Sequence, residues 1–229
     1  MTFTYNYPMQ SVTADAVVFA VKNGKLKQLV ITRGKEPFVG KMALPGGHTD
    51  QNEDPLDTCI RELGEETGFG LLKSSLVQVG AYGTPYRDPR GHYVTVAYVC
   101  LVSFDRLLEA VTALGGQGMD DAKEVLINDR PIKNSEFAFD HQQISLDALN
   151  VLGNWSQRNM LEFTLWAKDT LGEQFTARHI RELHQVVRKE EIDAGNFTKI
   201  INGWVDEKII ENVGESKVGY KGALYNFVK

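Results

Sequence analysis

The feature of this 229-residue chain that most constrains its fold is the segment 46–69, where acidic residues crowd one predicted helix. Within it Glu62, Glu65 and Glu66 stand at positions i, i+3 and i+4, which share one face of an α-helix. Each such like-charge pair costs about 0.2–0.5 kcal/mol in an isolated helix. Arg61 neutralises only part of this negative charge, so the remaining repulsion among the glutamates must be relieved by a further positive partner.

Local signals set the limits of this helix. Pro45-Gly46-Gly47 breaks the chain after an apolar strand, Asp54-Pro55 can cap and open a helix, and Thr67-Gly68 can end it. The positions at three- and four-residue spacing that would face a core are Leu56, Cys59, Ile60 and Leu63. The glutamates are therefore expected beside a glycine-rich strand–loop–helix turn.

A divalent cation is one partner that would relieve the repulsion. Mg2+ and Mn2+ prefer oxygen ligands, and Mg2+ commonly keeps waters while it engages substrate phosphates. The loop could add a backbone carbonyl near Gly46. The alternative is a solvated acidic face, which is the usual role of such a helix surface.

The surrounding spacing resembles the signature of the Nudix hydrolase family, in which all fixed positions are filled. These positions are Gly47, Glu53, Arg61, Glu62, Leu63, Glu65, Glu66, Gly68 and Phe69. The resemblance implies that Glu62, Glu65 and Glu66 are metal ligands and that Arg61 orients the glutamates. It also implies that Glu53 braces the loop or reaches the metal through water. A pattern with this many fixed positions is far more specific than a short glycine motif.

The chain before residue 141 alternates strands and turns around the signature helix. Strands are expected at 16–20 and 26–32, with Asn23-Gly24 as a hairpin turn, and again at 77–82 and 93–104. This is an α+β pattern. The resemblance makes it a Nudix α/β/α sandwich with a mixed sheet.

The remainder suggests two further parts. Residues 141–171 form a predicted connector helix region, with an interruption at Gly153-Asn154, and the Nudix domain is expected to span 1–140. Residues 172–229 predict helix, helix and hairpin, with Thr176 and Asp193 as helix caps. That order is typical of a winged helix.

Three segments outside the signature resemble the ADP-ribose pyrophosphatase branch of the family. They are 32–38 with 44–47, 86–91, and Phe139-Asp140-His141. Arg87 and Arg90 could hold a diphosphate or a ribose hydroxyl, since guanidinium groups suit bidentate contacts with anions, and Arg33 is a further candidate for substrate binding. Asp140 and His141 could reach the substrate or merely cap the connector helix. For the arginines the alternative is internal ion pairs or plain surface exposure.

The C-terminal part has no excess of positive charge. From residue 172 onward nine lysines and arginines face nine aspartates and glutamates. A Nudix domain followed by a winged helix resembles Nudix-related transcriptional regulators of NAD metabolism, which bind ADP-ribose as an effector. The lysines that could form a DNA-binding patch are Lys199, Lys217 and Lys221. The winged helix could instead serve only for dimerisation.

The composition excludes several other settings. No run approaches the ~18 apolar residues of a membrane span, and the first residues lack the pattern of a secretory signal. Cys59 and Cys100 lie in apolar contexts and are expected to be buried thiols, which favours the cytoplasm. The formal net charge of −5 argues against indiscriminate nucleic-acid binding.

Three functions follow as expectations. The first is a Mg2+- or Mn2+-dependent hydrolase that cleaves ADP-ribose or a related nucleoside diphosphate derivative into AMP and ribose 5-phosphate, with Glu62, Glu65 or Glu124 as general base. The second is an ADP-ribose-responsive DNA-binding regulator of NAD or sugar metabolism, acting as a homodimer. The third is an inactive interaction scaffold.

Overall fold

The computed structural model describes residues 6–129, 136–216 and 222–228, and the chain forms two compact units. The first unit comprises Met1–Phe19, Lys27–Cys100 and Asp105–Ala148; the second comprises Ala20–Leu26, Leu101–Phe104 and Leu149–Lys229. The predicted domain limits 1–140, 141–171 and 172–229 stay a prediction.

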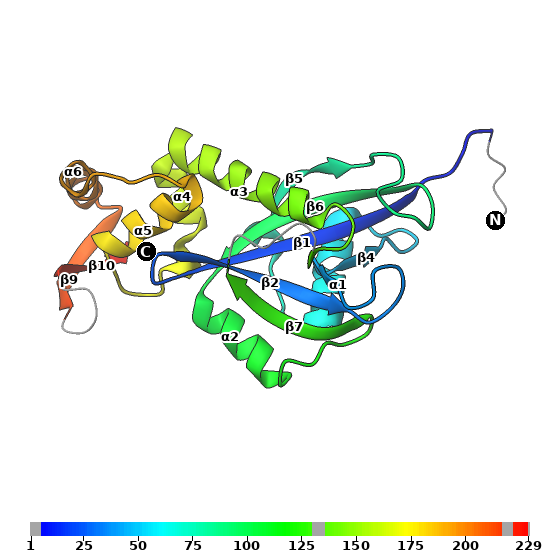
Figure 1. Ribbon diagram of the computed structural model, residues 1–229. Helices are drawn as coiled ribbons and strands as arrows, with labels where there is room; N and C mark the ends of the chain where they lie inside the picture. The colour runs from blue at the N-terminus through cyan, green and yellow to red at the C-terminus, as the bar shows by residue number, and fades with distance from the viewer. Residues whose placement is uncertain (1–5, 130–135, 217–221, 229) are drawn as a thin grey trace. The chain divides into compact units, whose positions relative to one another are not determined.

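The first half of the chain is rich in strands (Figure 1). Its strands are β1 (Ser11–Lys22), β2 (Lys25–Arg33), β3 (Met42–Ala43), β4 (Gly46–His48), β5 (Val77–Tyr82), β6 (Tyr93–Val102) and β7 (Ala122–Asp129). Its helices are α1 (Pro55–Thr67), the short 3-10 helix Lys73–Ser75 and α2 (Phe104–Ala113). The predicted α+β class is confirmed by this alternation.

Among the described residues these strands form one seven-stranded sheet in the order β3-β2-β1-β6-β5, with β4 added to β1 and β7 added to β2. Figure 1 shows β1 running through the middle of this sheet. Residues 13–20 of β1 are buried without a break, as expected for a strand covered on both faces. The antiparallel pairing of β4 with β1 places Asp15 opposite Gly46 and Ala14 opposite Gly47. The sheet thereby fixes the glycine loop against β1.

The connecting helix α3 (His141–Arg158) is continuous, so the predicted interruption at Gly153-Asn154 is wrong. The physical reason lies in close packing. A Cβ atom at Gly153 would stand 2.7 Å from the carbonyl oxygen of Val187, so the glycine allows a neighbouring backbone to approach the helix. In α3 the glycine marks a tight contact rather than a helix end.

The second unit contains the winged helix predicted from the sequence. Its elements are α4 (Met160–Trp166), the short 3-10 helix Lys168–Thr170, β8 (Phe175–Thr176), α5 (Ala177–Arg188), α6 (Ala194–Asp206), β9 (Ile210–Ser216) and β10 (Gly222–Phe227). The described strands form a three-stranded sheet, β8-β10-β9. Thr176 caps α5 with a capping box and Asp193 caps α6, as the sequence indicated.

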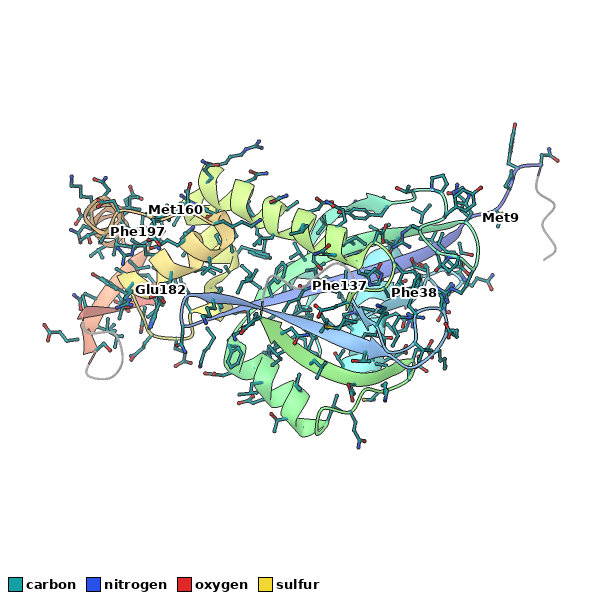
Figure 2. All side chains as sticks on the ribbon, viewed as in Figure 1. Met9, Phe38, Phe137, Met160, Glu182 and Phe197 are labelled. Atoms are coloured by element: carbon teal, nitrogen blue, oxygen red, sulfur yellow. The ribbon has the colours of Figure 1, made fainter. Side chains whose placement is uncertain are left out.

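An apolar core holds this unit together. Phe175, Ile180, Phe197 and Ile201 are almost fully buried in it, and Met160 of α4 packs against the same cluster. Met160 and Phe197 are labelled in Figure 2. Helix α4 lies within the predicted helical region 141–171 but was not predicted as a separate helix, and no helix was predicted at α2. Both are short, and α4 has only seven residues, too few for a clear helical repeat.

Candidate active site

Helix α1 begins and ends where its capping residues predict. The Asp54 carboxylate accepts hydrogen bonds from the backbone N–H groups of Leu56 and Asp57, and Pro55 occupies the first turn. Gly68 ends the helix in the left-handed conformation, with φ of 66°. These caps fix where α1 begins and ends.

Arg61 is the centre of the acidic cluster. Its Nη1 donates to Glu62 Oε1 and to Glu65 Oε2, each at 2.8 Å. Its Nε and Nη2 donate to the two carboxylate oxygens of Glu53 at 2.9 Å, and Nη2 also donates to the carbonyl oxygen of His48. One guanidinium therefore orients Glu62 and Glu65 and ties Glu53 to the glycine loop.

Glu53 is the best-satisfied carboxylate of this group. Besides Arg61, it accepts hydrogen bonds from the Thr58 hydroxyl at 2.8 Å and the Asp50 backbone N–H at 3.0 Å. The hydrogen bonds from Arg61, followed by that from Asp50, lower the pKa of Glu53 to about 2. Glu53 is thus a charged brace for the loop.

Glu66 points away from Arg61 and towards the glycine loop. It is 3% exposed, and its Oε2 accepts the backbone N–H of Gly46 at 2.9 Å. Burial, reinforced by the charges of Glu62 and Asp15, raises the pKa of Glu66 well above its ordinary value. Burial likewise raises the pKa of Glu62. These two carboxylates are costly to keep charged without a cation.

The two loop glycines are required for this close approach. A Cβ at Gly47 would lie 2.3 Å from the Glu62 carboxyl carbon, and a Cβ at Gly46 would lie 2.3 Å from the carbonyl oxygen of Ala14. No side chain fits at Gly46, where backbone atoms lie close, and a side chain at Gly47 would have to displace the Glu62 carboxylate from its bond with Arg61. The sequence pattern thus has a steric explanation as well as a chemical one.

The donor set suits a hard divalent cation, although its ligands are engaged within the protein. Oxygen donors, burial and mutual repulsion at Glu62 and Glu66 match the preferences of Mg2+ or Mn2+. Within the ranges that the structure describes, no three acidic, histidine or cysteine side chains already converge as a ligand group. Glu62 and Glu65 are held by Arg61 instead. The assignment of Glu62, Glu65, Glu66 and the Gly46 carbonyl as metal ligands stays a prediction.

Glu66 and the three predicted arginines line one pocket of the first unit. Arg33, Arg87 and Arg90 lie in its wall together with Glu66 and Gly46. Glu124 lies elsewhere, on β7, where it accepts a hydrogen bond of 3.3 Å from the Thr32 hydroxyl. The pocket therefore brings a cationic group next to the glycine loop and α1.

The three arginines differ in how their charge is used. Arg90 is paired with Asp88 and Arg87 with Asp140, in each case through two or more hydrogen bonds. Arg33 has no ion pair with any residue in the described part of the chain, and its Nε donates to the Pro37 carbonyl oxygen at 2.7 Å. Burial, followed by the nearby Arg90 charge, lowers the pKa of Arg33. Arg33 is the least neutralised cation of this wall.

Phe139, an aromatic residue that was not predicted from the sequence as part of the site, contacts two of these arginines. The Arg33 guanidinium lies 4.9 Å from the Phe139 ring centre and that of Arg90 lies 5.8 Å from it. Phe38, labelled in Figure 2, meets the same ring edge-on at 4.9 Å. Phe139 has a φ of 50°, which is unusual for a bulky residue. The segment Phe139-Asp140-His141 was part of the resemblance to the ADP-ribose pyrophosphatase branch. The hydrophobic periodicity of the chain, however, gave no reason to expect the Phe139 ring in the site.

Asp15 is another residue of the site that was not predicted from the sequence. It is 6% exposed, lies in the pocket wall and accepts the Thr95 hydroxyl at 2.6 Å. A charged residue inside an otherwise apolar strand was the available signal. His141, which the sequence linked to either substrate or helix capping, lines the same pocket, and burial lowers its pKa.

In the second unit, Lys199 is exposed on α6. The other predicted DNA-binding lysines, Lys217 and Lys221, lie outside the described residues. Three polar neighbours of Lys199 on α6, Asn196, Thr198 and Asn202, are also exposed. Helix α6 therefore exposes amide and hydroxyl groups with one cation, Lys199. In the described ranges, no helix combines the length and apolar character needed to cross a bilayer.

A glycine loop and acidic helix mounted on this sheet define a NUDIX fold. Residues 11–123 match the NUDIX domain family model. The ADP-ribose pyrophosphatase of Methanocaldococcus jannaschii is 34% identical over 146 residues, which cover 62% of this chain and 74% of that protein. The chain belongs to the NUDIX family, and the predicted resemblance is confirmed.

Other similarities extend over the C-terminal unit. The "ADPR responsive transcriptional repressor NtrR" of Acinetobacter baylyi is 28% identical over 226 residues, covering 97% of this chain and 84% of that protein. The crystal structure of Shewanella oneidensis NrtR complexed with a 27mer DNA matches with a TM-score of 0.72 and 25% identity, covering 95% of this chain and 93% of that one. The predicted fold, a NUDIX sandwich followed by a winged helix, is confirmed by this likeness.

Proposed function

We propose that the first unit binds ADP-ribose, or a related nucleoside diphosphate derivative, and hydrolyses its diphosphate to AMP and ribose 5-phosphate with Mg2+ or Mn2+. The observation that carries this proposal is the pocket in which Arg33 and Glu66 lie together. Arg33 offers positive charge without a carboxylate partner, and Glu66 offers a buried carboxylate with a raised pKa. A diphosphate bound together with a divalent cation would bring negative charge to Arg33 and a cation to the Glu66 carboxylate.

The chain supplies binding and orientation for this reaction. Arg33 would hold the diphosphate, and Arg90 would reinforce the positive end of the pocket. Glu62, Glu65, Glu66 and the Gly46 carbonyl would hold the cation. When bound, the cation would neutralise charge on the diphosphate and lower the pKa of a water molecule.

Arg61 has two roles in this proposal. It holds Glu62 and Glu65 in defined rotamers, and its positive charge offsets their repulsion while no cation is present. Glu65 is half exposed, at 49% of its side chain, so it can change partner at low cost. Glu65 and Glu62 are the two candidates for the general base because both lie on the α1 face that carries the metal ligands. Glu124, held by Thr32 on β7, is a weaker third candidate.

A substrate panel tests the proposal. ADP-ribose, nucleoside triphosphates and diadenosine polyphosphates are compared as substrates of the full chain with Mg2+ and with Mn2+. ADP-ribose is expected to have the highest kcat/KM, with AMP and ribose 5-phosphate formed in equal amounts. A clear preference for a triphosphate would overturn the substrate assignment.

A second candidate function is a DNA-binding transcriptional regulator whose affinity for its operator depends on ADP-ribose. Its support is the winged helix joined to the NUDIX unit, in a chain similar over almost its whole length to a transcriptional repressor. A homodimer would place two winged helices on a symmetric DNA site, so that the two weak affinities of the single winged helices combine. The two functions are compatible in one protein.

Electrophoretic titration of promoter DNA from genes of NAD metabolism, with and without ADP-ribose, tests this second function. Tight, ADP-ribose-sensitive binding to one promoter supports a regulator. Absence of binding to every promoter at low salt would reject it and leave the winged helix as a dimerisation module.

A further inference from the structure

His141, the first residue of α3, is held in one tautomer by the protein. It is 4% exposed, and its Nδ1 lies 2.9 Å from the backbone nitrogen of Leu44, which donates to it. A ring nitrogen that accepts a hydrogen bond carries no proton, so the neutral ring has its proton on Nε2. The imidazole is therefore a fixed N–H donor at its other end.

The Nε2 end has no hydrogen-bond acceptor among the described residues. The nearest carboxylate oxygen, Asp15 Oδ2, is 3.8 Å away, which is too far for a hydrogen bond. Asp15 Oδ2 accepts the Thr95 hydroxyl at 2.6 Å and is thereby oriented. Asp15 and His141 both line the pocket that contains Arg33 and Glu66. A buried donor and a buried acceptor thus stand side by side on a shared pocket wall.

The chemistry of this pair differs from that of the arginine wall. Asp15, together with nearby Glu66, disfavours phosphate by like-charge repulsion. A hydroxyl group suits it, because a hydroxyl can accept from an N–H and donate to a carboxylate at once. Two separated polar groups also match two neighbouring hydroxyls of a sugar.

We propose that Asp15 and His141 form a hydroxyl-recognition pair that binds a ribose of the nucleoside diphosphate derivative. The inference rests on the proposed function, because it takes the ligand of the pocket to be a nucleoside diphosphate that carries ribose. Arg33 and Arg90 then hold the diphosphate while the pair selects the sugar. Two sources of the hydroxyl share this chemistry: the ribose of the nucleoside and the distal ribose of ADP-ribose.

Two substitutions at one position separate recognition from a structural role. In His141→Asn the amide oxygen can stand near Nδ1 and keep the bond from Leu44, but the Nε2 donor is lost. In His141→Gln an amide N–H can stand near Nε2, but the acceptor for Leu44 is lost. A recognition role makes the Asn variant the weaker binder. A purely structural role makes the Gln variant the less stable protein and leaves ligand binding by the Asn variant intact.

The experiment measures Kd by calorimetry for ADP-ribose and for ADP, without metal, on the full chain and its variants. His141→Asn and Asp15→Asn are expected to weaken ADP-ribose binding about 10-fold or more, with His141→Gln closer to the unmodified protein. His92→Asn, an exposed histidine outside the pocket, is the matched control. Circular dichroism and melting curves establish that each variant is folded.

The outcomes show which ribose the pair binds, and they separate the pair from the hydrolase function on which the inference rests. If the substitutions weaken ADP as much as ADP-ribose, the pair binds the nucleoside ribose; if only ADP-ribose weakens, it binds the distal ribose. Unchanged affinities of His141→Asn and Asp15→Asn for both ligands would overturn the pair. Binding without any turnover rejects the hydrolase but leaves the pair standing. Absence of metal-free binding of either ligand by the unmodified protein rejects the pair, and the hydrolase is then judged separately by turnover with Mg2+ or Mn2+.

Discussion

Arg87 and Asp140 are joined by two parallel hydrogen bonds, from Nε to Oδ2 at 2.9 Å and from Nη2 to Oδ1 at 2.5 Å. The Arg87 side chain is only 6% exposed and lies in the pocket wall, whereas Asp140 holds it from outside the pocket lining. Because its charge is already neutralised, Arg87 contributes to the shape of the pocket more than to its positive field. The two residues were selected from the sequence as separate ligand contacts, and the structure joins them.

Arg33 is expected to dominate the binding of the diphosphate. Arg33→Ala should raise KM for ADP-ribose about 10- to 100-fold with a smaller change in kcat, since a hydrogen bond to a charged group contributes roughly 1.5–3 kcal/mol. Steady-state kinetics measure both constants. An unchanged KM would show that the diphosphate does not contact Arg33.

Arg87→Ala should mainly reduce stability. It leaves the Asp140 carboxylate, 25% exposed, without its partner, at a cost of about 1–3 kcal/mol in the free energy of unfolding. The double variant Arg87→Ala/Asp140→Ala should recover part of this loss, because no unpaired charge remains. Denaturant unfolding of the single and double variants measures the coupling. Additive losses would contradict the pairing.

Glu66→Gln should strongly reduce turnover while it stabilises the metal-free protein. Loss of one such interaction typically lowers the rate about a hundred- to a thousand-fold. The pKa of Glu66 is raised in the folded state, mainly by burial, so its stabilising contribution is complete at low pH and is lost as pH rises through the folded pKa. Unfolding of the metal-free protein should therefore be less sensitive to pH in Glu66→Gln. The exposed Glu109→Gln on α2 is the control and should change neither property.

His184 links three helices of the second unit and should make its stability depend on pH. It is fully buried, with Nδ1 2.7 Å from the Ser156 hydroxyl oxygen and Nε2 2.8 Å from that of Thr164. The Ser156 oxygen also accepts from Arg188 Nε at 2.7 Å, so Ser156 is left to donate its proton to Nδ1. A second proton on the ring would face this donor and the Arg188 charge.

Burial lowers the pKa of His184 from 6.5 to about 3. The stability that the neutral ring contributes is present above pH 6.5 and falls between pH 6.5 and 3, because only the unfolded state takes up a proton there. The expected slope is about 1.4 kcal/mol per pH unit. Urea unfolding of the unmodified protein and His184→Gln across this range isolates the contribution. Equal pH dependence in both proteins would contradict it.

The elements that could be predicted from the sequence are those with strong local signals. Asp54, Thr176 and Asp193 each cap the helix that their position indicated, because a side-chain cap depends on a few neighbouring residues only. Cys59 and Cys100 are buried, as their apolar surroundings indicated. The course of α3 through Gly153 could not be predicted, because the contact with Val187 joins residues far apart in the chain.

The residues of the site also fall into two groups: those that local spacing predicts and those that only the fold brings together. The Arg61 network with Glu53, Glu62 and Glu65 lies within one segment, and its spacing made it visible. Asp15, Phe139 and the direction of His141 became visible only when the sheet placed β1 beside the glycine loop. Pairings such as Arg87 with Asp140 depend on folding, so the sequence could name the residues but not their relation.

Weak binding of generic duplex DNA is expected of the second unit. Nine basic residues face nine acidic ones from residue 172 onward, and non-specific affinity depends on cations that displace counterions. If an operator is bound, Lys199→Ala should weaken it and reduce the salt dependence by about one unit of slope. Titrations at two salt concentrations measure this. Strong salt-dependent binding to random DNA would contradict the charge argument.

The most direct test of the proposed hydrolase is the turnover of ADP-ribose by the full chain with Mg2+ or Mn2+, with AMP and ribose 5-phosphate quantified. The expected result is metal-dependent formation of both products in equal amounts by the unmodified protein, reduced about a hundred-fold or more in Glu66→Gln. The proposal is contradicted if the folded protein forms neither product with either metal, or if Glu66→Gln retains full activity.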